Sequence, residues 1–281
     1  MAIAYLIYLC CASSFLIVDC QKSIKLHSYD SLISHLANGS DVRYFFDTSG
    51  CAPHTVRSRG DNPVFGGTVS LFGVIKDTGQ GTGVTFFSHV RYIDENPKDL
   101  NEEIQSMWIT NDVAEIFWGK PGFFVNNTDG VDGIFCNWTR GEGNIWVKQH
   151  SEQKQLTSFS DIQTMLTSGE DIRWVVNLGG CKCSPDSGKC QEGSFGDTVR
   201  DFKIHQNGSI SFSSSMTAII PLSWRYVRFI AFGHIYQNNT ASFMVSELDP
   251  TTWDNGGNFM VSCPIASTST TTGAKFYINN E

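Results

Sequence analysis

The chain has 281 residues, of which 41% are hydrophobic and 17% charged, with a formal net charge of −8 and a pI near 5.3. This acidic balance argues against recognition of nucleic acid, since phosphate contacts need a basic face. The sequence has no polybasic run that would indicate attachment to a membrane surface.

The first twenty residues have the pattern of a secretory signal peptide. Residues 2–18 are an almost unbroken apolar run, and a cleavage site after Cys20 would leave Gln21 as the new N-terminus. The run is shorter than the ~20 residues that a membrane helix needs, and no second such run follows. A cleaved signal is therefore predicted in preference to an anchor, although the segment before the run contains no Lys or Arg.

An internal repeat is the strongest signal in the sequence. Residues 28–51 align without a gap on residues 158–181, and residues 65–72 align in the same register on residues 195–202. These segments share 12 identities in 32 aligned pairs, where unrelated sequences would give roughly two. A repeat offset by 130 positions predicts two homologous domains in tandem.

Each copy begins with a predicted amphipathic helix. Ser28 and Ser158 are placed as N-caps, and Gly39 and Gly169 are placed where a left-handed residue ends a helix. A helix of about ten residues does not persist alone, so it must pack on other structure. The apolar residues with helical spacing are Tyr29, Leu32, Ile33 and Leu36 in the first copy and Phe159, Ile162 and Leu166 in the second.

The rest of each copy is predicted to be antiparallel β-structure. Short aromatic and β-branched runs separated by Gly, Asn and Asp are typical of a barrel or sandwich. The fold class is therefore α+β, with two tandem domains that are each mostly antiparallel sheet with one short N-terminal helix. The predicted strands are residues 41–46, 69–74, 84–93, 104–110, 113–118 and 145–148, and then 171–176, 199–205, 209–213, 225–235, 242–246, 259–263 and 275–278.

The two domains are predicted to comprise residues 21–148 and 156–281, after the signal at residues 1–20. The polar stretch at residues 148–155 is the natural linker between them. Each domain has about 125 residues, which is enough for an ordinary hydrophobic core.

Loss of the signal leaves six cysteines, an even number that implies disulfides in an exported chain. Cys51 and Cys136 are 85 positions apart, and Cys181 and Cys263 are 82 apart, so each pair is predicted as the same bond in its own domain. Cys183 and Cys190 then close a small loop. An exchange of Cys181 with Cys183 is the main alternative pairing. A zinc site at the clustered cysteines is disfavoured because no fourth ligand lies nearby.

Five Asn-x-Ser/Thr sequons indicate glycosylation of surface turns in a eukaryotic secretory pathway. Their acceptors are Asn38, Asn126, Asn137, Asn207 and Asn238.

The order of segments in each copy resembles the VirK-like family of small exported proteins. A serine-capped helix is followed by Gly-x-Asp and a Val-Arg or Ile-Arg pair, then by a strand that ends at a cysteine. Phe-Phe-Ser-His (86–89) or Phe-Ser-Ser (212–214) comes later, and the last strand carries Ile-Phe-Cys (134–136) or Val-Ser-Cys (261–263). The resemblance supports the duplicated domain and the cysteine pairs. It implies no catalytic residue, and Ser214 stands where the first copy has His89.

No motif with comparable strength indicates catalysis, a metal or a cofactor. The sequence has no Gly-x-Ser-x-Gly elbow, its histidines lack metal-ligand spacing, and the oxygen-rich residues 126–133 lack the pattern of an EF-hand. The two Asp-x-Arg pairs, Asp41/Arg43 and Asp171/Arg173, could grip an anionic ligand. A cross-strand ion pair at the sheet surface is the favoured interpretation.

Ligand contacts are expected where the copies diverge, after Phe72 and Phe202, because function concentrates on variable loops that a rigid sheet supports. The expected residues are His89, Trp108, Trp118, Trp224, Tyr226 and His234.

The predicted function is that of a secreted, disulfide-bonded and glycosylated binding or extracellular-matrix protein. Its partner would be an extracellular glycan, a small aromatic molecule or a matrix protein. The alternative is a secreted enzyme with an aromatic and histidine pocket but no motif, such as a cofactor-independent oxygenase of the luciferase kind. An enclosed aromatic pocket with one or more inward-facing histidines, in one domain only, would favour the enzyme, and two equivalent shallow surfaces would favour binding.

Overall fold

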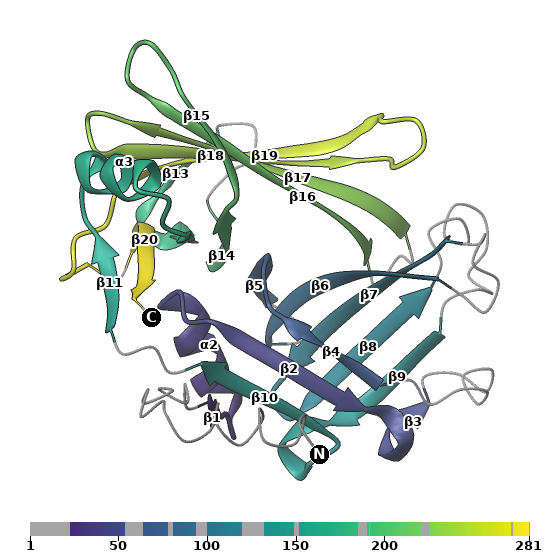
Figure 1. The fold of residues 1–281 in the computed structure, drawn as a ribbon. Helices are drawn as coiled ribbons and strands as arrows, with labels where there is room; N and C mark the ends of the chain where they lie inside the picture. Colours follow the sequence, from purple (N-terminus) through teal and green to yellow (C-terminus); the bar gives the residue numbers. More distant parts are fainter. Residues whose placement is uncertain are drawn as a thin grey trace, which may run out of the picture.

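The structure is a computed structural model that describes residues 23–53, 64–77, 81–93, 100–119, 132–148, 152–184, 190, 192–220, 225–270 and 272–280. These residues are mostly antiparallel β-sheet with two α-helices (Figure 1). No helix in these ranges is long and apolar enough to cross a membrane. The α+β class expected from the sequence is therefore confirmed, whereas the tandem-domain boundaries stay a prediction.

The elements follow one another in the same order in both halves of the chain. The first half contains β1 (Ser23–Lys25), α2 (Tyr29–Ala37), β2 (Val42–Asp47), the 3-10 helix η1 (Thr48–Gly50), β3 (Ala52–Pro53), β4 (Val64–Thr68), β5 (Phe72–Asp77), β6 (Gly81–Ile93), β7 (Leu100–Thr110), β8 (Val113–Gly119), β9 (Asp132–Asn137), the 3-10 helix η4 (Trp138–Arg140) and β10 (Gly143–Lys148). The second half contains β11 (Glu152–Leu156), α3 (Phe159–Thr167), β12 (Ile172–Asn177), the 3-10 helix η5 (Leu178–Gly180), β13 (Lys182–Cys183), β14 (Gly193–Val199), β15 (Asp201–Ile204), β16 (Ile210–Ile220), β17 (Arg225–Tyr236), β18 (Thr240–Leu248), β19 (Asn255–Pro264) and β20 (Gly273–Asn280).

The strands of each half form two sheets with the same pairing order. In the first half these are β1-β10-β2-β4 and β5-β6-β7-β8-β9-β3, and in the second half they are β11-β20-β12-β14 and β15-β16-β17-β18-β19-β13. Strand β14 also pairs with β5, which joins a four-stranded sheet of the second half to the six-stranded sheet of the first. The two halves therefore share one continuous ten-stranded sheet, and β14 and β5 meet near its centre (Figure 1).

The helices form where the sequence predicts them. The hydroxyl groups of Ser28 and Ser158 accept hydrogen bonds from the amides of Ser31 and Asp161, at 3.2 and 3.1 Å, as N-caps do. Gly39 and Gly169 have φ angles of 72° and 88°, the left-handed conformation that ends a helix. Helix α2 buries Leu32 and Leu36, and α3 buries Phe159, Ile162 and Leu166, which supplies the stability that so short a helix lacks alone.

Each half has its own hydrophobic core between its two sheets. The core of the second half packs the helix residues Ile162 and Leu166 and the four-stranded sheet against the inner face of the six-stranded sheet, which contributes Phe212 and Phe243. The core of the first half is built in the same way but also includes Val175 and Tyr277 from the second half. The two cores are therefore in contact at the junction of the halves.

Two sequence-based boundaries were wrong, for the same physical reason in both halves. The single strands predicted at residues 69–74 and 199–205 are each interrupted, because β4 and β14 pair with one sheet and β5 and β15 with the other. A chain that changes sheet must break its ladder at the corner. The predicted linker at residues 148–155 also contains a strand, β11, which pairs with β20 despite its polar composition.

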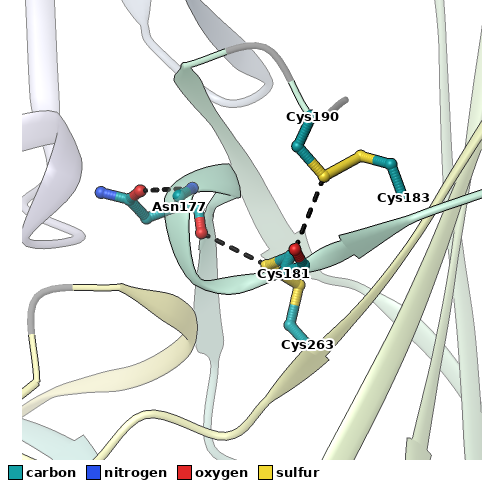
Figure 2. Close-up of a disulfide and its surroundings, with 6 residues drawn as sticks. Asn177, Cys181, Cys183, Cys190 and Cys263 are labelled. Carbon is teal, nitrogen blue, oxygen red and sulfur yellow. Dashed lines mark hydrogen bonds between the residues drawn. A yellow bond between two sulfur atoms is a disulfide. The ribbon is translucent and has the colours of Figure 1, made fainter. Parts of the chain in front are cut away.

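Three disulfides close the two halves with the predicted pairing: Cys51–Cys136, Cys181–Cys263 and Cys183–Cys190. The last two lie together beside η5, where the side chain of Asn177 accepts a hydrogen bond from the Gly179 amide at 3.1 Å (Figure 2). The Cys181 sulfur lies 3.3 Å from the carbonyl oxygen of Asn177. In the first half the long-range disulfide connects the segment after η1 to β9, and in the second half it connects the segment after η5 to β19.

Candidate functional site

The outer face of the six-stranded sheet in the second half carries the candidate site. Side chains alternate along its strands, so one set fills the core and the other points away from it. Residues Phe212, Ala231, Ile235, Phe243 and Val261 belong to the buried set. The alternate positions place three kinds of side chain on the outer face: histidines, serines, and exposed aromatic or methionine residues.

Two histidines flank a serine on this face. His205 Nε2 lies 2.6 Å from the hydroxyl of Ser211, and the same hydroxyl lies 3.2 Å from His234 Nδ1. Ser211 and His234 face each other across β16 and β17, whereas His205 directly follows β15. A hydroxyl can donate one hydrogen bond and accept others. Ser211 can therefore connect two neutral imidazole rings, one as donor and one as acceptor.

Ring stacking extends this group along β17. The rings of His205 and His234 have centroids 5.6 Å apart and planes inclined by 16°, and Tyr236 stacks on His234 with centroids 4.5 Å apart. The hydroxyl of Tyr236 lies 3.2 Å from that of Ser242 on β18. We call these five residues, His205, Ser211, His234, Tyr236 and Ser242, the polar ladder.

Burial and charge favour the neutral form of one ladder histidine. The pKa of His234 is lowered from its usual value, first by partial desolvation and then by the neighbouring His205. A neutral His234 keeps a lone pair on one ring nitrogen, so the ladder offers both donors and acceptors of hydrogen bonds.

An apolar row lies beside the polar ladder. Phe232 on β17 pairs with Met244 on β18, which in turn pairs with Met260 on β19. Phe232 and Met260 are exposed, as is Tyr236 of the ladder. Exposed apolar side chains that are adjacent, and not scattered singly, are typical of an interaction surface.

Trp253 adds a strained and exposed aromatic ring to the same face. Its φ angle is 62°, which is unusual for a bulky side chain. The guanidinium of Arg228 lies 4.7 Å from the centroid of the Trp253 ring, and the backbone amide of Trp253 donates to the carbonyl of Asp249 at 2.9 Å. Strained backbone of this kind clusters at functional sites.

The predicted ligand residues are only partly brought together. His234 belongs to the polar ladder, but Trp118 is buried in the first-half core against Phe65, at a centroid distance of 5.1 Å. Trp108 is half-buried, and its ring packs over Gly83. His89 on β6 pairs with Ile104 on β7, and Tyr226 on β17 pairs with Ile219 on β16, so the structure places both in strand pairs outside the polar ladder. Trp224 lies outside the described residues.

Sequence reasoning missed four residues of the polar ladder, His205, Ser211, Tyr236 and Ser242. His205 and Ser211 are six positions apart on the two sides of a tight hairpin turn, in which the His205 amide donates to the Ser209 carbonyl at 2.8 Å. Only the hairpin register brings the two side chains together, so the spacing in the sequence carried no signal.

Two of the predicted glycan acceptors lie at the hairpin tips beside the ladder. The side-chain oxygen of Asn207 accepts from the Ser209 hydroxyl at 2.8 Å, and that of Asn238 accepts from the Thr240 hydroxyl at 2.6 Å. Both asparagines are exposed, as is Asn38. Asn137 is less exposed and has the same contact with Thr139 at 3.1 Å. The fifth acceptor, Asn126, lies outside the described residues.

The groups on the outer face suit recognition of a neutral ligand better than of a metal ion. Among the described residues, no cluster of three or more His, Cys, Asp or Glu side chains could hold a metal. Aromatic rings present flat apolar faces, and tyrosine, serine and histidine present polar atoms at their edges. This combination matches a ligand that has an apolar face and several hydroxyl groups.

Comparison with known proteins finds a similarity in the second half of the chain. Residues 155–253 match the family described as VirK protein. A crystal structure of a VirK family protein from Legionella pneumophila is 17% identical in sequence, with a TM-score of 0.37, and the alignment covers 43% of this chain and 97% of that one. No curated protein sequence matches the chain.

Proposed function

We propose that this VirK-like protein is a secreted glycoprotein that binds a glycan through the outer face of its second-half sheet. The polar ladder beside an exposed apolar row is the observation that carries the proposal. The predicted signal peptide, the sequons and the three disulfides support passage through an oxidising secretory pathway.

The chemistry of the face favours a sugar over the other ligands. Tyr236 and Phe232 are exposed and can lie against the apolar face of a pyranose ring. The ring nitrogens of the two histidines and the hydroxyls of Ser211 and Ser242 can exchange hydrogen bonds with sugar hydroxyls. A small aromatic molecule would use the rings but leave these polar groups without partners, which costs free energy.

Binding is favoured over catalysis because the histidines lie on a sheet face. His234 and Ser211 are only partly buried, and Tyr236 is exposed. An enzyme that handles a reactive intermediate needs a site that excludes water. The site is therefore better suited to hold a ligand than to transform it.

A glycan array with the mature, glycosylated chain tests the proposal, followed by calorimetry with the glycans that are retained. We expect Tyr236→Ala to weaken binding about tenfold, since stacking of a ring contributes up to ~1.4 kcal/mol. We expect His234→Ala to weaken it about fivefold, as for the loss of one neutral hydrogen bond. His27→Ala, which removes an exposed histidine in the first half, is the matched control and should have no effect. Retention of no glycan, or equal losses for all three variants, would refute the proposal.

A secreted enzyme is the second candidate, and the 2.6 Å contact between His205 Nε2 and Ser211 Oγ is the observation that favours it. A neutral imidazole at this distance can accept the proton of a serine nucleophile. A cofactor-independent oxygenase would instead use a histidine as base towards an aromatic substrate. Chromogenic esters and oxygen uptake with aromatic substrates test these activities, and Ser211→Ala distinguishes them, since only the ester reaction needs that hydroxyl.

A further inference from the structure

The junction between the halves is a built interface within one chain. Its backbone part is the antiparallel pairing of β14 with β5, in which Ser194 faces Val74 and Gly196 faces Phe72. Its side-chain part places the first half against the outer face of the second-half sheet β11-β20-β12-β14. There Val175 and Tyr277 join the first-half core.

The junction joins two surfaces, a sheet face with its edge strand in the second half and the strand and helix packed on it in the first half. Each surface has a counterpart in the other half, because the two halves have the same strand order. The first-half sheet β1-β10-β2-β4 corresponds to the sheet that is covered, and β15 with α3 corresponds to β5 with α2, which cover it. In the described part of the chain, β4 and β15 each lie at the edge of a sheet with a partner on one side only. Among the described residues, nothing therefore covers the outer face of the first-half sheet β1-β10-β2-β4, and the β15 and α3 surface of the second half covers no other sheet.

At the strands of the junction, residues that the junction buries have counterparts in the other half that are exposed. Ser194 is 8% exposed in the junction, and the corresponding Val64 is 56% exposed. Phe72 is 1% exposed, and the corresponding Phe202 is 41% exposed.

The sheet faces show the same contrast. Val175 is 1% exposed and the corresponding Phe45 is 41% exposed. Arg173 is 6% exposed, whereas the side chain of Arg43 is 53% exposed. Three exposed large apolar residues therefore have counterparts in the other half that the internal junction buries. They are Phe45, Val64 and Phe202.

The free edges also have matching backbone groups. The Val69 amide donates to the Val42 carbonyl at 2.8 Å, and partners alternate along an antiparallel pair, so the backbone groups of Val64 and Gly66 point away from β2. The His205 amide donates to the Ser209 carbonyl, so by the same alternation Phe202 and Ile204 point away from β16.

Shifting the internal register by 130 positions pairs these same four residues. Ser194 opposite Val74 becomes Val64 opposite Ile204, and Gly196 opposite Phe72 becomes Gly66 opposite Phe202. All four residues present the backbone groups that such a ladder needs.

The helix ends complete the correspondence. A Cβ on Gly39 would overlap the ring of Tyr277, so α2 closely approaches the second-half sheet. At the corresponding Gly169 of α3, no atom lies within 4 Å of an added Cβ. The half-buried Trp146, which faces Arg43 as Tyr277 faces Arg173, is the side chain that Gly169 of another copy would meet.

We propose that the protein assembles head to tail with further copies of itself, by pairing β4 of one copy with β15 of the next in the geometry of its own β14–β5 junction. This contact joins two different surfaces, so it is heterologous and leaves a free surface of each kind at the two ends. An assembly of this type grows into a linear array unless its rotation closes a ring. The partner is a second copy because the template of the interface lies within the chain.

Sedimentation velocity over about a hundredfold range of concentration tests the assembly, since association follows mass action. We expect the weight-average mass of the mature chain to rise with concentration beyond that of a dimer. A mass that stays at the monomer, or stops at a dimer, overturns the proposal.

Edge variants test the geometry. Val64→Pro removes an outward amide from β4, and Ile204→Pro removes one from β15; proline is tolerated at sheet edges. We expect each variant alone to remain monomeric. An equimolar mixture should form dimers that grow no further, since Ile204→Pro still offers β4 and Val64→Pro still offers β15.

Lysine variants at the same positions control for misfolding of the proline variants. A lysine at a sheet edge disfavours pairing with another strand but does not constrain the backbone as proline does. Val64→Lys and Ile204→Lys should give the same two monomers and the same dimeric mixture. Lys203→Ala, which leaves the outward backbone groups in place, is the matched control and should assemble like the parent chain. Larger assemblies of either single variant, or a mixture that stays monomeric while both variants keep the parent circular dichroism spectrum, overturn the head-to-tail geometry.

Discussion

Arg173 Nη2 donates a hydrogen bond to the carbonyl oxygen of Val69 at 3.2 Å and thereby joins the two halves of the chain. The guanidinium is buried, which lowers the pKa of Arg173, while Asp41 of the first half and Asp197 of the second act in the opposite direction. Burial also raises the pKa of Asp197. An ion pair is present in the first copy, in which Arg43 lies 3.9 Å from Asp41, but it joins residues of the same segment and not the two strands that were expected. For the second copy that prediction was wrong, since the junction covers Arg173.

Replacement of Arg173 by alanine should strongly destabilise the protein. The change removes the bond to Val69 and leaves Asp41 and Asp197 without their buried counter-charge, which typically costs about 3–5 kcal/mol. Arg43→Ala is the matched control and should cost less than about 1 kcal/mol, as for an exposed ion pair. Chemical denaturation measures both values, and equal losses would contradict the buried role of Arg173.

The two helix-ending glycines should respond differently to the same substitution. Both have left-handed backbone, so alanine at either position costs about 1 kcal/mol in strain. Gly39→Ala also forces a methyl group against the ring of Tyr277, and overpacking of this kind adds about 1–3 kcal/mol. Thermal unfolding of dilute Gly39→Ala and Gly169→Ala should therefore show the larger loss for Gly39. A loss at Gly169 as large as that at Gly39 would mean that the contact with Tyr277 is unimportant.

The disulfides should differ in their contribution to stability. Cys181–Cys263 spans 82 positions and Cys183–Cys190 only 7. Loop-closure entropy then predicts losses of ~4.5 and ~2.5 kcal/mol when each pair is replaced by serine. Denaturation of the two double variants measures the difference, and peptide mapping confirms that the remaining bonds keep their pairing. A greater loss for the short loop would show that packing of the sulfurs, and not chain entropy, dominates.

Much of the fold could be predicted from local patterns. The caps at Ser28 and Ser158, the left-handed glycines and the cysteine spacing all act within a few residues or through the repeat, so the sequence displays them directly. The sheet corner between β4 and β5 was missed because Val69 to Phe72 continue the apolar pattern while the hydrogen-bond partners change. The pairing of β14 with β5 was missed for a related reason: no local feature indicates which edge a strand will meet.

The site could be predicted only in part. His234 was expected because it lies where the copies diverge, and it does belong to the polar ladder. His205 and Ser211 become neighbours only through the register of β15, β16 and β17, which composition does not specify. Trp118 was expected to contact ligand because of its residue type, but its position on β8 points into the core, where it packs on Phe65.

Acidification should weaken the fold through His234. Its pKa is lowered in the folded protein, so below an unfolded-state pKa of about 6.5 the unfolded chain binds more protons at this site than the folded chain. The contribution of neutral His234 is therefore fully present above about pH 6.5 and is lost as the pH falls from there through the lowered folded-state value. His35, whose pKa is also lowered by burial, acts in the same direction. The free energy of unfolding of the parent chain should therefore decrease as the pH falls from about 6.5 to 5.5.

The difference between the parent chain and His234→Gln isolates the contribution of this one histidine, since glutamine keeps a hydrogen-bonding side chain beside Ser211 but does not titrate. We expect the pH dependence of the variant to be shallower than that of the parent, and that of the control His27→Gln to match the parent. Glycan affinity should follow the same pattern, because a protonated His234 loses its acceptor nitrogen and interacts unfavourably with the neighbouring His205. A pH dependence of stability that His234→Gln leaves unchanged would mean that the polar ladder does not titrate between these pH values.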